Sequence, residues 1–312
     1  MVDSMSKNCW LLLAVAALSW CNTGVVWLIQ FSCYPLWPYV GRDEFFNYHG
    51  VWWQSTWAVV LVPGAVVTVG SILMLRFVPP GVPRWAPWLG FGLQLIVQFV
   101  TAVWLSPLDR HIVAVGGGLN LASFERLVMV NWLRIVLVTT YAVLTYWMLT
   151  RSFWPMTRNR WLLLGTSALG LYAIGNVWLV QLVCYRLWSH VGRSEAFGYH
   201  TAWWHSIWGV LFVPAALVFL GALALLWVRP SGVNGRLVWL GLTLQLIIYA
   251  STAVWWAPLM ARLVTQDSGM SLRDYHLLMS THWIRLALIT AYGVASFYML
   301  IKSAAASQWG AS

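Results

Sequence analysis

Long apolar runs alternate with short polar breaks along the chain, and this pattern predicts membrane-spanning helices. A helix crosses the hydrocarbon core of a bilayer with about 20 apolar residues. Two runs exceed a single crossing and contain Pro63 and Pro214, where the missing N–H predicts a kink. The runs lie near residues 9–31, 44–77, 86–106, 121–150, 160–182, 195–228, 237–257 and 272–301.

The runs form two consecutive copies of one pattern, with equivalent residues 151 positions apart. The register continues without a gap, which indicates an internal duplication with a period far longer than that of solenoid repeats. We therefore predict an all-α integral membrane protein with eight transmembrane helices in two four-helix repeats, residues 1–150 and residues 151–312. Each repeat has an even number of helices, so both insert in the same direction. We expect a pseudo-twofold axis along the membrane normal to relate them.

Composition supports a membrane location. The chain is 61% hydrophobic and 8% charged, with a mean hydropathy of +0.72, whereas soluble domains contain about 25% charged residues. The 25 tryptophans are expected mainly at the headgroup level, with an apolar pocket as the second option. The net charge of +10 is explained by topology and anionic lipid headgroups. Membrane lipids are therefore the expected partners, and nucleic acid is not.

The distribution of charge between the predicted loops indicates orientation. The loops on the side of both termini carry Lys and Arg with Asp3 as their only acid. The opposite loops mix Arg with all the other acids. By the positive-inside rule, both termini are expected in the cytoplasm of the cell. The basic residues on the terminal side are Lys7, Arg76, Arg84, Arg151, Arg158, Arg160, Arg229, Arg236 and Lys302.

Polar residues gather at similar depths in the outer half of each repeat. Charged side chains within a membrane usually face a bundle interior or a wet cavity and mark function. We therefore expect a site in each half, although Arg134 and Arg285 could instead clamp carbonyl groups for structure. The predicted catalytic residues are His200, His282, Arg285, His49 and Arg134. The predicted substrate-binding residues are Gln30, Gln94, Asn131, Gln181, Gln245, Tyr48 and Tyr199.

The two copies differ in histidine content. His276, His282 and His205 stand where the first copy has Glu125, Asn131 and Gln54, respectively. If a single copy is active, this favours the second. Metal ligation would require His200 and His282 to converge from different helices, with His276 or Glu195, because no helix carries a paired-ligand spacing. His49 and His200 could alternatively bind a haem between the copies. The spacing specifies neither, so no metal residues are assigned and the cofactor is left open.

The cysteines give no zinc or redox signature, because none has a CxxC spacing. Cys33 and Cys184 occupy equivalent positions, which permits a disulfide between the copies. Packing of two small apolar side chains is the simpler interpretation.

The stretch from Gln30 to His49, QFSCYPLWPYVGRDEFFNYH, resembles the signature of small bacterial four-helix membrane proteins of unknown function. The segment from Asn131 to Arg134 resembles it too. These proteins are distantly similar to the anthrone-oxygenase-like family, whose characterised members resemble cofactor-free oxygenases of polycyclic anthrones. The resemblance covers each half in turn and implies a fused tandem pair in a bacterial inner membrane. The chain departs from the pattern at Trp52 and Trp203, where a second histidine often follows the Tyr-His pair, which weakens any metal or acid–base role.

Two functions are compatible with these residues. In the first, a membrane enzyme uses His200 or His49 as a general base on a lipophilic, ionisable substrate, and Arg285 or Arg134 holds the resulting anion. In the second, the protein is a carrier or a lipid-, haem- or cofactor-binding subunit of a membrane complex. Ion-coupled transport is the weaker case, since coupling groups are expected near the midplane and no acid lies at that depth.

Overall fold

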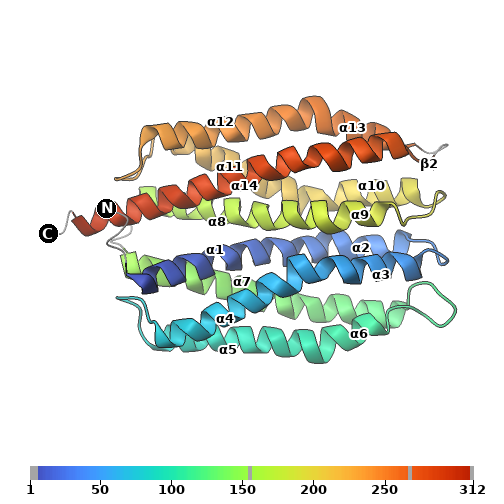
Figure 1. Cartoon of the computed structure of the whole chain (residues 1–312), viewed down its shortest axis with the longest axis horizontal. Helices are drawn as coiled ribbons and strands as arrows, with labels where there is room; N and C mark the ends of the chain where they lie inside the picture. The colour runs from blue at the N-terminus through green and yellow to red at the C-terminus, as the bar shows by residue number, and fades with distance from the viewer. Residues whose placement is uncertain (1–5, 154–156, 266–268, 310–312) are drawn as a thin grey trace.

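The protein is described from a computed structural model that covers residues 6–153, 157–265 and 269–309. Its helices lie roughly parallel, and both ends of the chain are at the same end of the bundle (Figure 1). The first half contains α1 (Lys7–Leu28), η1 (Ile29–Cys33), α2 (Tyr34–Leu36), η2 (Trp37–Tyr39), α3 (Phe45–Thr56), η3 (Trp57–Leu61), α4 (Val62–Arg76), α5 (Trp85–Phe99), η4 (Val100–Leu105), α6 (Ser106–Arg110) and α7 (Leu121–Phe153). The second half contains α8 (Arg158–Leu179), η5 (Val180–Cys184), α9 (Tyr185–Trp188), α10 (Ala196–Ile207), η6 (Trp208–Phe212), α11 (Val213–Ala224), α12 (Gly235–Ser251), η7 (Thr252–Trp256), α13 (Ala257–Leu263), the short strands β1 (Val264–Thr265) and β2 (Gly269–Met270), and α14 (Leu272–Trp309).

Consecutive helical segments join into 8 continuous apolar spans within the described residues, each long enough to cross a membrane. This confirms the predicted number and placement of the helices and fits a polytopic membrane protein. The first span continues to Tyr39 and the fifth to Trp188, whereas the apolar pattern predicted ends near residues 31 and 182. Both extensions continue past polar or aromatic residues, because helical hydrogen bonds do not require apolar side chains.

Most spans are interrupted by a π-helical turn rather than by a sharp break. The turns η3 and η6 lie directly before α4 and α11, which have Pro63 and Pro214 in their first turn. A proline at that position lacks the N–H that would continue the α-helical ladder, and a wider π turn accommodates the change. The turns η4 and η7 precede Pro107 and Pro258 in the same way. At the predicted kink positions, the structure thus has a π turn directly before each proline-containing helix.

The α1 and α8 helices lie side by side at the centre of the molecule (Figure 1). In the most apolar stretch of their spans, 67% and 72% of the residues are buried inside the protein. The corresponding share in the other spans is 28–39%. Their backbones touch at two glycines: a Cβ on Gly24 would meet the carbonyl of Tyr172, and one on Gly175 would meet the carbonyl of Cys21. Small residues at such crossings let membrane helices pack closely.

Two contacts between the halves join residues that are 151 positions apart. The Cys33 and Cys184 sulfurs are 3.5 Å apart and both side chains are buried. The Tyr48 and Tyr199 hydroxyls are hydrogen-bonded at 2.9 Å. Each of these residues therefore meets its own counterpart.

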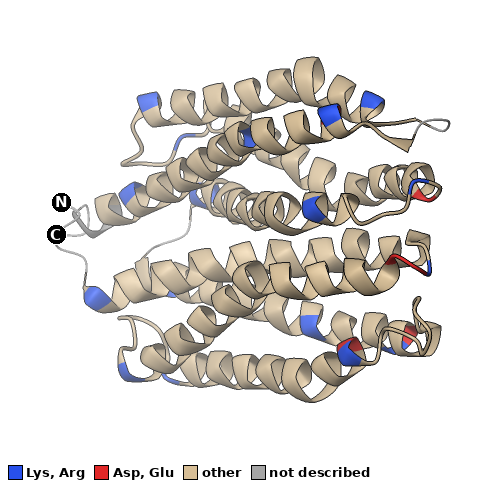
Figure 2. Ribbon diagram, turned by 45° about the vertical axis from the view of Figure 1, so that its right-hand side comes forward, with Lys and Arg blue, Asp and Glu red and all other residues tan. Residues whose placement is uncertain are grey.

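Charged residues distinguish the two ends of the bundle. Figure 2 shows the described acidic residues gathered at the end away from both termini, whereas Lys and Arg occur at both ends. Exposed tryptophans occur both at the end of the bundle that holds the termini and farther along the spans. At the end with the termini they are Trp10, Trp85, Trp88, Trp161, Trp227 and Trp239, and farther along the spans they are Trp57, Trp104, Trp132, Trp208, Trp255 and Trp283. Other tryptophans, including Trp37 and Trp203, are buried.

Candidate functional site

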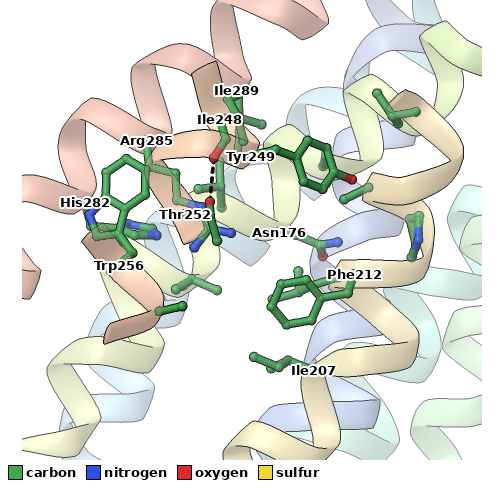
Figure 3. A pocket seen from close by; sticks show the side chains of 18 of the residues that line it. Asn176, Ile207, Phe212, Ile248, Tyr249, Thr252, Trp256, His282, Arg285 and Ile289 are labelled. Carbon is green, nitrogen blue, oxygen red and sulfur yellow. Dashed lines mark hydrogen bonds between the residues drawn. The ribbon is translucent and has the colours of Figure 1, made fainter. Parts of the chain in front are cut away.

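The second half contains a cavity between its four spans. Its volume is about 130 Å³, or about 1130 Å³ when the open space around it is included. The walls are mainly aliphatic and aromatic, and include Trp203, Phe212 and Ile248. Ile207 and Phe212 face the cavity across from the side chains of α14 and η7 (Figure 3). The cavity is therefore suited to a lipophilic molecule.

Three of the five residues predicted for one second-half site line this cavity: Gln245, His282 and Arg285. His282 and Arg285 lie one helical turn apart on α14, so they share a face. Gln181 contacts His282 but is not part of the wall, and His200 lies outside the cavity.

Arg285 is the cationic group of the cavity. Its guanidinium lies over the Trp256 ring, 5.6 Å from the ring centroid, in a cation–π contact. The buried Nε has no hydrogen-bond partner among the described residues. The described residues that line the cavity include no Asp or Glu. Arg285 therefore has an aromatic neighbour but no neutralising anion in the cavity.

The protonation of His282 follows from its hydrogen bonds. Its Nδ1 is 2.8 Å from Oε1 of Gln181, and the Gln181 amide nitrogen donates to the Met279 carbonyl at 3.1 Å. Because Gln181 Oε1 can only accept, His282 Nδ1 must carry the hydrogen. In the neutral imidazole, Nε2 is then an acceptor with a free lone pair.

The first half repeats this network with an amide in place of the imidazole. Asn131 donates to Oε1 of Gln30 at 2.7 Å, and Gln30 donates to the Val128 carbonyl at 3.4 Å. Asn131 thus reproduces the donor function of His282 Nδ1. An amide offers no basic nitrogen, so the first half lacks the counterpart of His282 Nε2.

The first-half cavity is smaller and contains an acid. It has a volume of about 60 Å³ and is lined by Tyr34, Trp52, Asp109 and Arg134, among others. A neighbouring space of about 30 Å³ also reaches Arg134. Asp109 and Arg134 thus share one cavity, whereas the equivalent positions of the second half hold Met260 and Arg285.

His49 and His200 pack at equivalent places near the outer end of the bundle, against Trp37 and Trp188. His49 Nε2 contacts Oδ1 of Asp109 at 3.2 Å, which links it to the first-half cavity. His200 has no equivalent acid, and its buried Nε2 makes no hydrogen bond to a side chain among the described residues. The structure thus places neither histidine in a cavity with its arginine.

The other predicted binding residues lie elsewhere. Tyr48 and Tyr199 are buried against each other between the halves. Gln94 accepts a long hydrogen bond of 3.4 Å from Thr68, and Gln98 donates to the same hydroxyl at 2.8 Å. Neither tyrosine nor Gln94 lines the two main cavities.

No group of three His, Cys, Asp or Glu side chains in the described part of the chain could hold a metal ion. His200 and His282 are not joined by a common cavity, and His49 is engaged by Asp109.

Two features of the site were not predicted from the sequence. One is the set of π turns, which place Phe212, Thr252 and Trp256 on the cavity wall. The prolines that follow these turns were the available signal. The other is the exchange of Asp109 for Met260, which a comparison of the two copies at the ends of their third spans would have revealed.

No protein-family model, curated protein or solved structure matches the chain.

Proposed function

We propose that the second half of this membrane protein binds a lipophilic molecule whose polar end meets Arg285 and His282. The observation that carries the proposal is a half-buried arginine, with a buried Nε and no acidic partner, in an otherwise apolar cavity. An uncompensated charge within a membrane costs several kcal/mol, roughly 2.5–3.5 on insertion scales. A ligand that supplies hydrogen-bond acceptors to the guanidinium would offset that cost, and its apolar part would fill the aromatic walls.

The proposed ligand site has a direct test in purification. We expect the wild-type protein, purified in mild detergent, to retain a lipophilic small molecule that mass spectrometry detects near one equivalent per chain. Arg285→Gln should lose most of it. Arg236→Gln is the matched control, because Arg236 is an exposed arginine at the other end of the bundle, and it should retain the ligand. Wild-type protein without a bound molecule, or equal retention by Arg285→Gln, would contradict the proposal.

A membrane enzyme is the second candidate, favoured by His282 Nε2. A free imidazole lone pair one turn from a guanidinium provides a base and an electrostatic clamp, which proton abstraction from a lipophilic substrate requires. The resemblance to anthrone oxygenases points in the same direction. On this proposal the base is His282 rather than His200 or His49, because His282 lines the cavity with Arg285.

We also propose that residues 1–150 and 151–312 are two four-helix repeats related by a pseudo-twofold axis along the membrane normal. Contacts of Cys33 with Cys184 and of Tyr48 with Tyr199 support this. In an isologous interface, residue i of one copy contacts j of the other while j contacts i. Gly24 with Tyr172 and Gly175 with Cys21 follow that rule.

Both termini are proposed to lie in the cytoplasm of the cell, because the end of the bundle without described acids carries the basic loops. A C-terminal alkaline phosphatase fusion should be inactive and a C-terminal fluorescent protein fusion should fluoresce. The opposite pair of results would reverse the assignment.

A further inference from the structure

We infer that the ligand of the second-half cavity is an amphiphile with a carboxylate headgroup, and that Asp109 is the built-in substitute for this headgroup in the first half. The inference rests on the proposed ligand site and names the chemistry of its occupant. It follows from a comparison of the two cavities within one molecule.

The two cavities have the same framework. Tyr34, Trp52 and Thr101 of the first-half wall correspond to Tyr185, Trp203 and Thr252 of the second-half wall. Each cavity also has an arginine at the equivalent position of the fourth span: Arg134, which is buried, or Arg285, which is half-buried. Any difference in what the two cavities can bind therefore comes from the wall residues that differ between the halves.

The decisive difference is charge. In the first half, the Asp109 carboxylate lines the cavity of Arg134 and bonds to His49. It makes no direct salt bridge with Arg134, whose Nε and Nη2 lack partners among the described residues, but it supplies a negative charge within the same cavity. In the second half, Met260 is at the Asp109 position, and His200 and Arg285 have no acid there. The cationic framework has thus been kept while its carboxylate is missing. A ligand carboxylate is the group that restores the charge balance seen in the first half.

The surroundings of Arg285 favour an external anion. Trp256 replaces Leu105 of the first half and covers the guanidinium with a ring. A stacked guanidinium keeps its in-plane N–H groups available, and these match a carboxylate in a bidentate pair. The aromatic contact thus holds the arginine in place without neutralising it.

The shape of the cavity fits an amphiphile oriented like a lipid of the outer leaflet. His282, Arg285, Ile289 and Tyr292 form one stripe along α14, which extends about 15 Å at the helical rise of 1.5 Å per residue. The cationic end of the stripe is toward the outer end of the helix. The inner end meets apolar side chains such as Val218. A ligand with its headgroup at Arg285 and its hydrocarbon chain pointing inward would place charge at the cationic end and apolar groups at the apolar end.

The test is equilibrium binding to the full-length protein in phosphatidylcholine nanodiscs. Three radiolabelled probes with the same hydrocarbon chain and different headgroups are compared: oleate, oleyl alcohol and oleyl phosphate. Charged hydrogen bonds are stronger than neutral ones, so oleate should bind about tenfold or more tightly than oleyl alcohol. Equal affinity for oleate and oleyl alcohol would overturn the carboxylate inference while leaving the proposed ligand site intact. Tighter binding of oleyl phosphate than of oleate would assign the site to a phosphate headgroup instead. Binding of none of the three would overturn the proposed ligand site itself.

Two variants, each of which replaces a second-half residue by the aspartate at the equivalent first-half position, provide a matched comparison. Met260→Asp introduces the carboxylate of the first half and should remove the preference for oleate, with oleyl alcohol still bound. Ser194→Asp introduces the same side chain at an exposed outer position, where the first half has Asp43, and should leave oleate binding unchanged. Arg285→Gln should also equalise the affinities for oleate and oleyl alcohol, which keeps the test decisive if Met260→Asp fails to fold. A preference for oleate that survives in Arg285→Gln would overturn the inference.

Discussion

One residue type, arginine, is held in two different environments at equivalent positions. Arg134 shares its cavity with Asp109, whereas Arg285 lies over Trp256 without an acid in the described wall. A buried charge is costly unless it is paired or hydrogen-bonded. Among the described residues, Nε and Nη2 of Arg134 and Nε of Arg285 are buried without a hydrogen-bond partner. The two environments therefore differ in the nearby carboxylate of Asp109, which shares the cavity of Arg134 and has no counterpart beside Arg285.

His282 combines a structural and a chemical role, and a single substitution separates them. His282→Asn keeps an N–H donor for Gln181, as Asn131 does for Gln30. We expect this variant to unfold within a few degrees of the wild type but to lose any function that needs Nε2. His282→Leu leaves Gln181 Oε1 unsatisfied and should lower the free energy of unfolding by about 1–3 kcal/mol. Thermal unfolding in detergent and ligand retention distinguish the two roles. Equal behaviour of the Asn and Leu variants would show that the Gln181 contact contributes nothing.

At the scale of helices, the π turns make the cavity walls irregular. A regular helix directs side chains to one stripe at spacings of three and four residues. The extra residue of a π turn changes that register locally, and such turns are frequent at functional sites. In the second half, η6 and η7 lie on the cavity wall. The walls of the cavity are thus determined by the same prolines that interrupt the spans.

The crossing of α1 and α8 gives a prediction about helix packing. Gly175→Ala places a methyl group against the Cys21 carbonyl, so the two central helices must separate. Overpacking of this kind costs about 1–3 kcal/mol, and the folded yield should fall. Gly165→Ala is the control on the same helix, because nothing lies within 4 Å of its Cβ position, and it should be neutral or slightly stabilising. Size-exclusion profiles and thermal unfolding provide the measurement. An unchanged Gly175→Ala would refute close backbone contact there.

The helices were predictable from the sequence, and the site was predictable only in part. Apolar length alone located the spans, because the hydrocarbon core fixes how many residues a helix needs. Depth along each helix correctly grouped His282 with Arg285 and Gln245. Depth does not give the direction in which a side chain points, so His200 was grouped with them although it packs on Trp188 outside the cavity. The role of Asp109 depends on a contact between two spans, which apolar patterns do not encode.

For the whole molecule, the pairing of equivalent residues gives a prediction about cross-linking. The Cys33 and Cys184 sulfurs are 3.5 Å apart, whereas a disulfide requires about 2.05 Å, so a small movement suffices. Oxidation with copper phenanthroline should produce a Cys33–Cys184 linked peptide in mass spectrometry, and Cys33→Ser should abolish it. Cys9 and Cys21 serve as internal controls and should stay reduced or link at random. If Cys9 or Cys21 is oxidised while Cys33 and Cys184 stay unlinked, the close contact of Cys33 with Cys184 would be contradicted.

The reciprocal contact of α1 with α8 has a consequence for how such a molecule can change over time. On the proposed symmetry, the chain is a dimer whose subunits are joined covalently, so their association does not depend on protein concentration in the membrane. In a dimer of identical chains, a substitution such as aspartate to methionine would alter both cavities at once. A fused chain can alter one and keep the other. On the proposed ligand site, the half with Asp109 can keep its own acid beside its arginine, while the half with Met260 is free to use an external molecule in that place.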